Sequence, residues 1–335
     1  MLLAGDVGGT KTRLAAYSLE NAKLKRTDIE RFDSRAFPGL DHIAREFIEK
    51  RKLKIEAACF GVPGPVMAGH VKLPNLPWEL SESALSKSLG IPRVKLVNDL
   101  VATAAAIPHL APGELMNVYP GRPQKDQRVY AVVAPGTGLG HAFLYVDDGK
   151  YHVMASEGGH TAFAPGDDLQ IELLNYLRKK FGHVSIERLI CGPGLVNIYN
   201  FLRDTARAPE SPEVKQRMLS EDPGAVIAQT ALDASSPLSV QALDIFISIL
   251  GAHCGNVVLM TMATAGLYLG GGIPPKIAKK FSDPKFLQAF RDKGRFAEVV
   301  DTTPINMIVD DHAAVVGAAS VASQLLSSVR IKTSS

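Results

Sequence analysis

One order of strands around a glycine-rich turn occurs twice in this chain, and this repeat limits the folds that the chain can adopt. In each copy a short apolar strand leads into the turn, and two further strand-like segments follow. The first copy spans residues 2–32 with its turn at 5–10, and the second spans 129–154 with its turn at 136–140. A repeated unit of this kind indicates two related halves. We therefore predict an α/β protein of two similar domains, which also suits a length of 335 residues.

Composition excludes several classes of protein. Lys and Arg total 37 against 34 Asp and Glu, so the net charge of +3 is too small to indicate a nucleic-acid partner. Three cysteines lie far apart without zinc-ligand spacing, which predicts no zinc site and favours a cytoplasmic location. Neither a signal peptide nor a membrane partner is expected: the apolar stretch 240–250 is too short to span a bilayer and contains Asp244.

Segment 94–100 carries the first candidate for catalysis. Its apolar residues predict a buried strand, and Asn98 and Asp99 follow at the carboxyl end, where open α/β sheets bind ligands. An alanine-rich helix is predicted behind them, ending before Pro108. Asp99 is thus a candidate general base. The alternative is that Asn98 or Asp99 only caps the helix.

Both glycine turns are candidates for binding phosphate. Glycine lets backbone N–H groups approach a phosphate closely, and Asp6 of the first turn is suited to holding Mg²⁺ through water. Neither turn is a Walker loop or a dinucleotide fingerprint, because no Gly-Lys-Ser/Thr follows and neither opens a helix. A third turn, Gly270-Gly271-Gly272, permits close approach of a ring or a ribose. Plain tight turns remain the alternative at each place.

Candidate sugar contacts lie in the second half. Glu157-Gly158-Gly159-His160 places a carboxylate and an imidazole on either side of two glycines, and a carboxylate can accept from two neighbouring hydroxyls. A solvated surface loop is the alternative. Glu187, taken alone, is most simply an acid in the first turn of a helix capped by Ser185.

Together these motifs resemble those of the bacterial glucokinases outside the ROK (repressor–kinase) branch of sugar kinases, over nearly the whole chain. The matching segments are 5–10, 97–99, 136–140, 157–160, 183–188, 192–197, 270–272 and 292–296. The resemblance implies a two-domain, actin-like (ribonuclease H-like) ATPase fold with a central cleft. The small domain would comprise residues 1–108 and 300–330, and the large domain 109–299.

The resemblance also implies the activity and the roles of the residues. It implies phosphorylation of D-glucose to glucose 6-phosphate with ATP and Mg²⁺, in a cytoplasmic homodimer. Sugar would be bound by Asn98, Asp99, Gly138, Glu157, His160 and Glu187, with Asp99 as the base. Nucleotide, phosphates and Mg²⁺ would be bound by Asp6, Gly8, Gly9, Thr10, Gly136, Thr137, Gly138, Gly271 and Gly272. Lys11 would either add a phosphate contact or be solvated.

Two other functions remain open at this point. One is a kinase for another hexose, such as mannose or N-acetylglucosamine, which would use the same fold and base. The other is a non-catalytic sugar sensor, which the presence of Asp99 disfavours.

Overall fold

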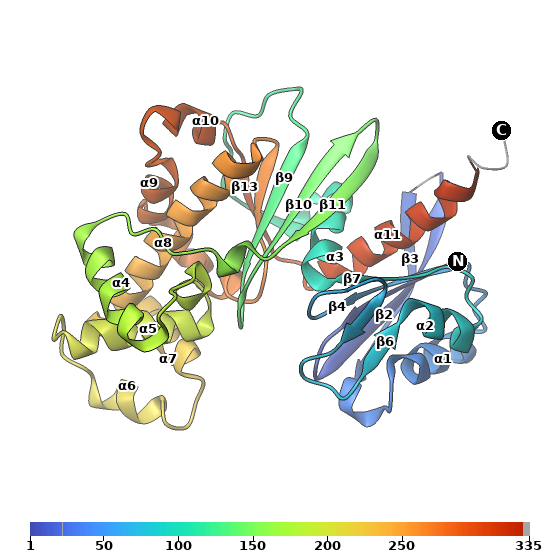
Figure 1. The fold of residues 1–335 in the computed structure, drawn as a ribbon, viewed down its shortest axis with the longest axis horizontal. Coiled ribbons are helices and arrows are strands. Elements are labelled where there is room, and N and C mark those ends of the chain that lie inside the picture. Colours follow the sequence, from blue (N-terminus) through green and yellow to red (C-terminus); the bar gives the residue numbers. More distant parts are fainter. Residues whose placement is uncertain (22, 331–335) are drawn as a thin grey trace. The chain divides into compact units, whose positions relative to one another are not determined.

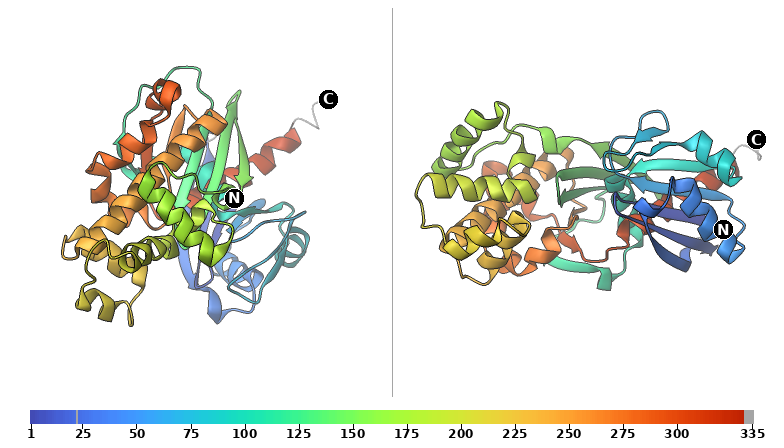
Figure 2. Two further views of the ribbon diagram at one scale, coloured as in Figure 1. Left: turned by 60° about the vertical axis from the view of Figure 1, so that its left-hand side comes forward. Right: turned by 90° about the horizontal axis from the view of Figure 1, so that it is seen from below.

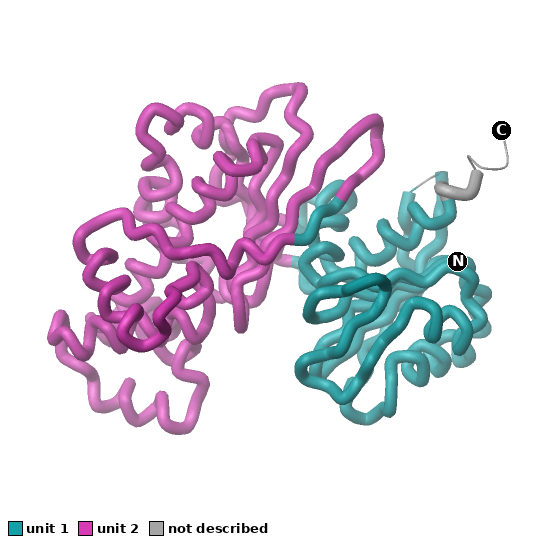
Figure 3. Tube along the Cα trace, in the orientation of Figure 1, with its two compact units in different colours: residues 1–114, 153–155, 310–335 teal, residues 115–152, 156–309 magenta. Residues whose placement is uncertain are grey.

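A computed structural model describes residues 1–21 and 23–330, and it divides the chain into two compact units. Unit 1 comprises residues 1–114, 153–155 and those from 310 onward, and unit 2 comprises 115–152 and 156–309 (Figure 3). The predicted boundaries need correction at 109 and at 300. Residues 300–309 belong to unit 2, because β13 (Ile305–Ile308) pairs with strands of its sheet, and residues 109–114 belong to unit 1.

Unit 1 contains a five-stranded sheet in the order β3-β2-β1-β4-β7. Its strands are β1 (Leu2–Val7), β2 (Lys11–Glu20), β3 (Lys23–Asp33), β4 (Ala57–Val62) and β7 (Val94–Asn98). β1, β2 and β3 are antiparallel neighbours, whereas β1, β4 and β7 run parallel. A small ribbon pairs β5 (His70–Lys72) with β6 (Glu79–Ser81).

Helices cover both faces of this sheet (Figures 1 and 2). On one face Leu3 packs with α1 (Leu40–Arg51) and α2 (Glu82–Leu89). On the other, its neighbours Leu2 and Ala4 pack with α3 (Asp99–Ala106) and α11 (Ala313–Arg330). The alternation follows from the two-residue period of a strand.

Unit 2 contains a six-stranded sheet in the order β11-β10-β9-β12-β13-β8. Its strands are β8 (Leu115–Tyr119), β9 (Val129–Pro135), β10 (Leu139–Asp147), β11 (Lys150–Ser156), β12 (Gly266–Leu269) and β13. β9 is antiparallel to β10 and parallel to β12, which is parallel to β13. This is the arrangement of unit 1 with β8 added at the edge, so the predicted repeat is confirmed.

The other elements of unit 2 are mostly helices that enclose a large apolar core with the sheet. They are α4 (Asp168–Phe181), α5 (Gly192–Asp204), α6 (Pro212–Arg217), α7 (Pro223–Leu232), α8 (Pro237–Thr261), α9 (Lys285–Arg291) and α10 (Ala297–Asp301). Short 3₁₀ turns over the whole chain are η1 (Ser34–Ala36), η2 (Ile107–His109), η3 (Pro112–Glu114), η4 (Gly158–His160), η5 (Ile186–Arg188), η6 (Pro274–Ser282) and η7 (Gly294–Phe296).

Helix α8 corrects the expectation that its segment is too short to span a bilayer. It has 25 residues and, by length and composition alone, is the one helix in the described chain that meets the requirement for a membrane span. However, 61% of its most apolar window is buried inside the protein, and Asp244 forms ion pairs with Lys280 and Lys285. Its burial is that of a core helix.

Candidate active site

In unit 1 the structure brings Asp6, Asn98 and Asp99 to the same end of the sheet. Asp6 on β1 lies opposite Gly61 on β4, and the next residue of β4, Val62, lies opposite Asn98 on β7. Asp99 follows at the first position of α3. The two carboxylates therefore flank the end of β4, at the carboxyl end of three parallel strands, where α/β sheets bind ligands.

Asn98 and Asp99 also begin helix α3. The side-chain Oδ1 atoms of both residues accept a hydrogen bond from the backbone N–H of Leu100, each at 2.9 Å. The amide nitrogen of Asn98 donates to the carbonyl of Gly64 at 3.2 Å. Both side chains therefore cap α3, as the alternative interpretation expected. The same hydrogen bonds fix the two side chains at the strand end, which is compatible with a role in binding.

The electrostatics at this sheet end suit a cation. Burial, together with the charge of Asp99, raises the pKa of Asp6 to about 6, although Arg13 on the neighbouring strand acts in the opposite direction. Arg13 itself forms an ion pair with Asp311, just before α11. Carboxylates are the kind of oxygen donors that Mg²⁺ takes, and a cation beside Asp6 would offset the effect of the Asp99 charge, so the residues fit this ion.

The first glycine turn is hydrogen-bonded to Ser34, a buried residue of η1. Its hydroxyl donates to the carbonyl of Gly8 at 2.8 Å, and its N–H donates to the carbonyl of Thr10 at 3.1 Å. Lys11 is exposed at the start of β2. Sequence reasoning missed both Ser34 and the Arg13–Asp311 pair. A signal for Asp311 existed, because residues 305–312 repeat the strand–acid–helix order of residues 94–99.

In unit 2 the second glycine turn connects to Glu187 and to α5. The N–H of Gly136 donates to the carbonyl of Gly138 at 2.8 Å, and the N–H of Leu139 donates to Oε2 of Glu187 at 2.9 Å. The first residue of α5, Gly192, donates to the carbonyl of Gly136 at 2.9 Å. The N-terminus of α5, a helix of 13 residues, thus adjoins this turn, which also contains Thr137. The positive end of the helix dipole and the hydroxyl of Thr137 are both suited to binding phosphate.

The third glycine turn lies beside the second. Gly270 donates from its N–H to the carbonyl of Val133 on β9 at 3.0 Å. Gly271 has φ +77° and leaves no room for a side chain, since a Cβ atom there would lie 2.5 Å from the carbonyl oxygen of Pro135. The predicted nucleotide residues of unit 2, including Gly272, therefore gather at the ends of β9 and β12.

Three of the four predicted sugar residues of unit 2, Glu157, His160 and Glu187, are also brought together. The N–H of Ile186 donates to the carbonyl of Thr161 at 2.9 Å, which joins the turn carrying Glu157 and His160 to the turn carrying Glu187. The Glu157 and His160 side chains are 76% and 64% exposed, with Oε2 and Nε2 3.9 Å apart. They are accessible to a ligand.

Glu187 and Ser185 differ from the simple interpretation of a capped helix. Residues 186–188 form only a 3₁₀ turn, and the Ser185 side chain makes no capping hydrogen bond. Cys191, which sequence reasoning missed, has a structural part here: its Sγ caps α5 by accepting from the N–H of Gly194 at 3.3 Å and donates to the carbonyl of Glu187 at 2.9 Å. Burial raises the pKa of this thiol to about 11, so it stays protonated.

Two matching sheets, with a glycine turn after β1 in one and after the corresponding strand β9 in the other, define an ATPase-type sugar kinase fold, and solved structures agree. A glucokinase from an Antarctic psychrotroph has a TM-score of 0.85 and 28% identity, covering 96% of this chain and 98% of that one. A Balamuthia mandrillaris glucokinase in complex with glucose has a TM-score of 0.76 at 21% identity, covering 96% and 93%, and supports the fold alone.

The chain belongs to the Glucokinase family, whose model matches residues 3–325. A glucokinase from Nostoc sp. is 38% identical in an alignment that covers 97% of this chain and 99% of that protein. A glucokinase from Photorhabdus laumondii is 34% identical, with 97% and 98% covered. The protein is therefore a hexose kinase.

Proposed function

We propose that this enzyme transfers the γ-phosphoryl group of ATP to the 6-hydroxyl of D-glucose. The observation that carries the proposal is the pair of carboxylates, Asp6 and Asp99, fixed at one end of the unit 1 sheet. Phosphoryl transfer needs one group to accept the hydroxyl proton and another to hold the cation that neutralises the phosphate charge. The names of the relatives from Nostoc and Photorhabdus support glucose as the acceptor.

Asp99 is the proposed base. Its backbone lies at the first position of α3, and the N–H of Leu100 orients its carboxylate. The proposed glucose contacts are Asn98, Asp99, Gly138, Glu157, His160 and Glu187. Carboxylates and amides among them can each accept or donate several hydrogen bonds to vicinal hydroxyls.

The glycine turns are the proposed nucleotide contacts. Gly8, Gly9 and Thr10 of the first turn and Gly136, Thr137 and Gly138 of the second would bind the phosphates, and Gly271 and Gly272 the adenosine. Mg²⁺, held at Asp6 through water, would neutralise phosphate charge during transfer. The exposure of Lys11 favours a solvated side chain.

An ADP-release assay across a panel of hexoses tests this function. We expect glucose to give a higher kcat/KM than mannose, fructose or N-acetylglucosamine; if another hexose is preferred, the kinase for that hexose replaces the proposal. Asp99→Asn should bind glucose in calorimetry but lose about 10²- to 10⁴-fold in kcat. Asp126→Asn, at an exposed position, is the matched control. A near-normal kcat for Asp99→Asn would remove this residue from the base role.

We also propose a cytoplasmic homodimer. The three cysteines are free and buried, which suits a reducing compartment. The dimer follows only from the family resemblance, and sedimentation velocity measures it directly; a monomer at micromolar concentration would refute it.

A further inference from the structure

Two buried histidines of unit 2 are hydrogen-bonded to each other next to the turn that carries two of the proposed sugar residues. His141 on β10 is 2% exposed and His253 on α8 is 5% exposed. Their Nε2 atoms lie 2.7 Å apart, and their rings meet edge to face with centroids 4.9 Å apart. A distance of 2.7 Å between two ring nitrogens requires that one of them carry the proton and the other accept it.

The environment keeps this hydrogen bond intact. Burial lowers the pKa of His141 to about 4, and burial together with the neighbouring His141 and Lys293 lowers the pKa of His253 to about 3. Both rings are therefore neutral near pH 7, as one donor and one acceptor. Within the residues that the structure describes, the bond to His253 is the single hydrogen bond of the His141 ring, because its buried Nδ1 has no partner.

His141 supports one end of the sugar segment. A Cβ atom on Gly158 would lie 3.4 Å from Nδ1 of His141, so the turn lies close to this ring. At Gly159 a Cβ atom would lie 2.2 Å from the carbonyl oxygen of Leu139, so the turn also lies directly against the start of β10. Glu157 precedes these two glycines and His160 follows them. The His141 ring thus lies next to the turn from which both side chains project.

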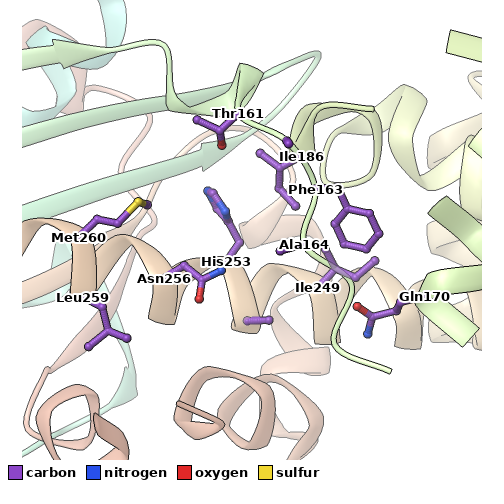
Figure 4. Close-up of a pocket in the computed structure, with 12 residues that line it drawn as sticks. Thr161, Phe163, Ala164, Gln170, Ile186, Ile249, His253, Asn256, Leu259 and Met260 are labelled. Atoms are coloured by element: carbon purple, nitrogen blue, oxygen red, sulfur yellow. The ribbon is translucent and has the colours of Figure 1, made fainter. Parts of the chain in front are cut away.

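His253 lies on the side of the pair nearer to the turn that carries Glu187. It lines a cavity of about 390 Å³ together with Thr161 and Ile186. In Figure 4 the imidazole of His253 rises from α8 toward these two residues. Their backbones are hydrogen-bonded to each other, and Glu187 follows Ile186 directly. The hydrogen-bonded pair therefore lies between the turn that carries Glu157 and His160, which is close to His141, and the cavity beside the turn that carries Glu187.

We propose that His141 and His253 form a positioning pair for the sugar site, in which the bond between the rings holds Glu157, His160 and Glu187 in place for glucose. Neither histidine touches the substrate in this account. The inference rests on the proposed function and on the proposed sugar site. It predicts a change in glucose affinity without a matching change in the phosphoryl-transfer step.

Two substitutions at one position separate the hydrogen bond from the packing. His253→Phe keeps a ring of similar shape but leaves Nε2 of His141 without its partner. His253→Gln keeps a polar group near the place of Nε2 and can restore the bond. We expect His253→Phe to raise the glucose KM about tenfold, equivalent to about 1.4 kcal/mol, with kcat and the ATP KM within about twofold. His253→Gln should stay within about threefold of the wild type in all three.

Controls make each result decisive. His109→Phe in unit 1 removes another part-buried histidine bond, to Ser320, and should leave the glucose KM unchanged. Glu157→Gln tests the sugar site itself: if it raises the glucose KM while His253→Phe does not, the pairing inference fails and the proposed function stands. If Glu157→Gln has no effect, the sugar site is wrong.

Two further outcomes would overturn the inference. One is a His253→Gln enzyme as impaired as His253→Phe, because the bond would then be irrelevant. The other is a parallel loss of kcat and ATP affinity in His253→Phe, which indicates general damage. If His253→Phe does not fold, the double variant His141→Phe/His253→Phe, which pairs two apolar rings and leaves no unpartnered nitrogen, provides the same comparison with His253→Gln.

Discussion

Acidification should destabilise the folded protein through the buried histidine pair. In the unfolded chain each histidine binds a proton with a pKa near 6.5, whereas the folded chain lowers the pKa of His141 to about 4 and that of His253 to about 3. The unfolded state therefore binds more protons below pH 6.5. The stability from two neutral rings is complete above pH 6.5 and is lost as the pH falls toward 4.

The size of the effect follows from the pKa difference. At pH 5 the unfolded histidine lies about 1.5 units below its pKa, and each unit is worth about 1.4 kcal/mol. Each ring thus removes about 2 kcal/mol, and the pair removes about 4 kcal/mol, relative to pH 7.5. This is a large fraction of the ~5–15 kcal/mol by which domains are stable.

Urea unfolding at steps between pH 5 and 8 measures the loss, and the double variant His141→Phe/His253→Phe is the control. Asp6 acts in the opposite direction, because a carboxyl whose pKa is raised to about 6 stabilises the folded state below that pH and not above it. Since Asp6 is present in both proteins, it cancels in the difference. From pH 8 to pH 5 the free energy of unfolding of the wild type should fall by several kcal/mol relative to that of the double variant. Parallel curves would refute the reasoning.

Three further predictions concern the two halves of the site. Glu157→Gln and Glu187→Gln should each raise the glucose KM about 10- to 100-fold, since charge-assisted hydrogen bonds are worth ~1.5–3 kcal/mol, and leave the ATP KM nearly unchanged in steady-state kinetics. Ser34→Ala should cost about 1–3 kcal/mol in urea unfolding, because the carbonyl of Gly8 loses its donor; an unchanged midpoint contradicts this. Asp6→Asn should raise the Mg²⁺ concentration for half-maximal rate about tenfold, and an unaltered Mg²⁺ titration would exclude Asp6 as a holder of the ion.

Local chemistry explains which elements the sequence could predict. Helix α1 begins and ends where its apolar spacing predicts, at Leu40 and Arg51. Helix α2 is bounded by the side chain of Ser81, which accepts from the N–H of Ala84, and by Gly90 with φ +66°. These signals lie within a few residues of the boundary. These local signals can therefore be recognised without knowledge of any tertiary contact.

Long-range contacts explain what the sequence could not predict. Strand β8 has no buried residue and exists through its pairing with β13, far along the chain. Helix α6 lies in the charged stretch 203–222, whose composition alone indicates a loop, and it is attached to the core by the buried Val214. His141 and His253, 112 residues apart, form their bond only once β10 and α8 pack.

The same limit applied to the site. Asp6, Asn98 and Asp99 could be recognised because each lies at or directly after the carboxyl end of a strand. Ser34 and Cys191 could not, since their role is to hold backbone groups that the fold brings near them. Residues that touch a ligand carry a local pattern, and residues that support them from behind do not.

The covering of the unit 1 sheet by α11 has a consequence for biosynthesis. Leu2, Ala4 and Tyr17 are buried against Val315 and Ala319 of this C-terminal helix. At about 5–20 residues per second, a ribosome adds that helix roughly 15 seconds to 1 minute after the strands that it covers. During that interval the part of this sheet face that α11 covers stays apolar and open, and it is a natural substrate for chaperones. Nascent chains that stop before residue 313 should never acquire a protected N-terminal unit, so this half of the enzyme is completed last although it is translated first.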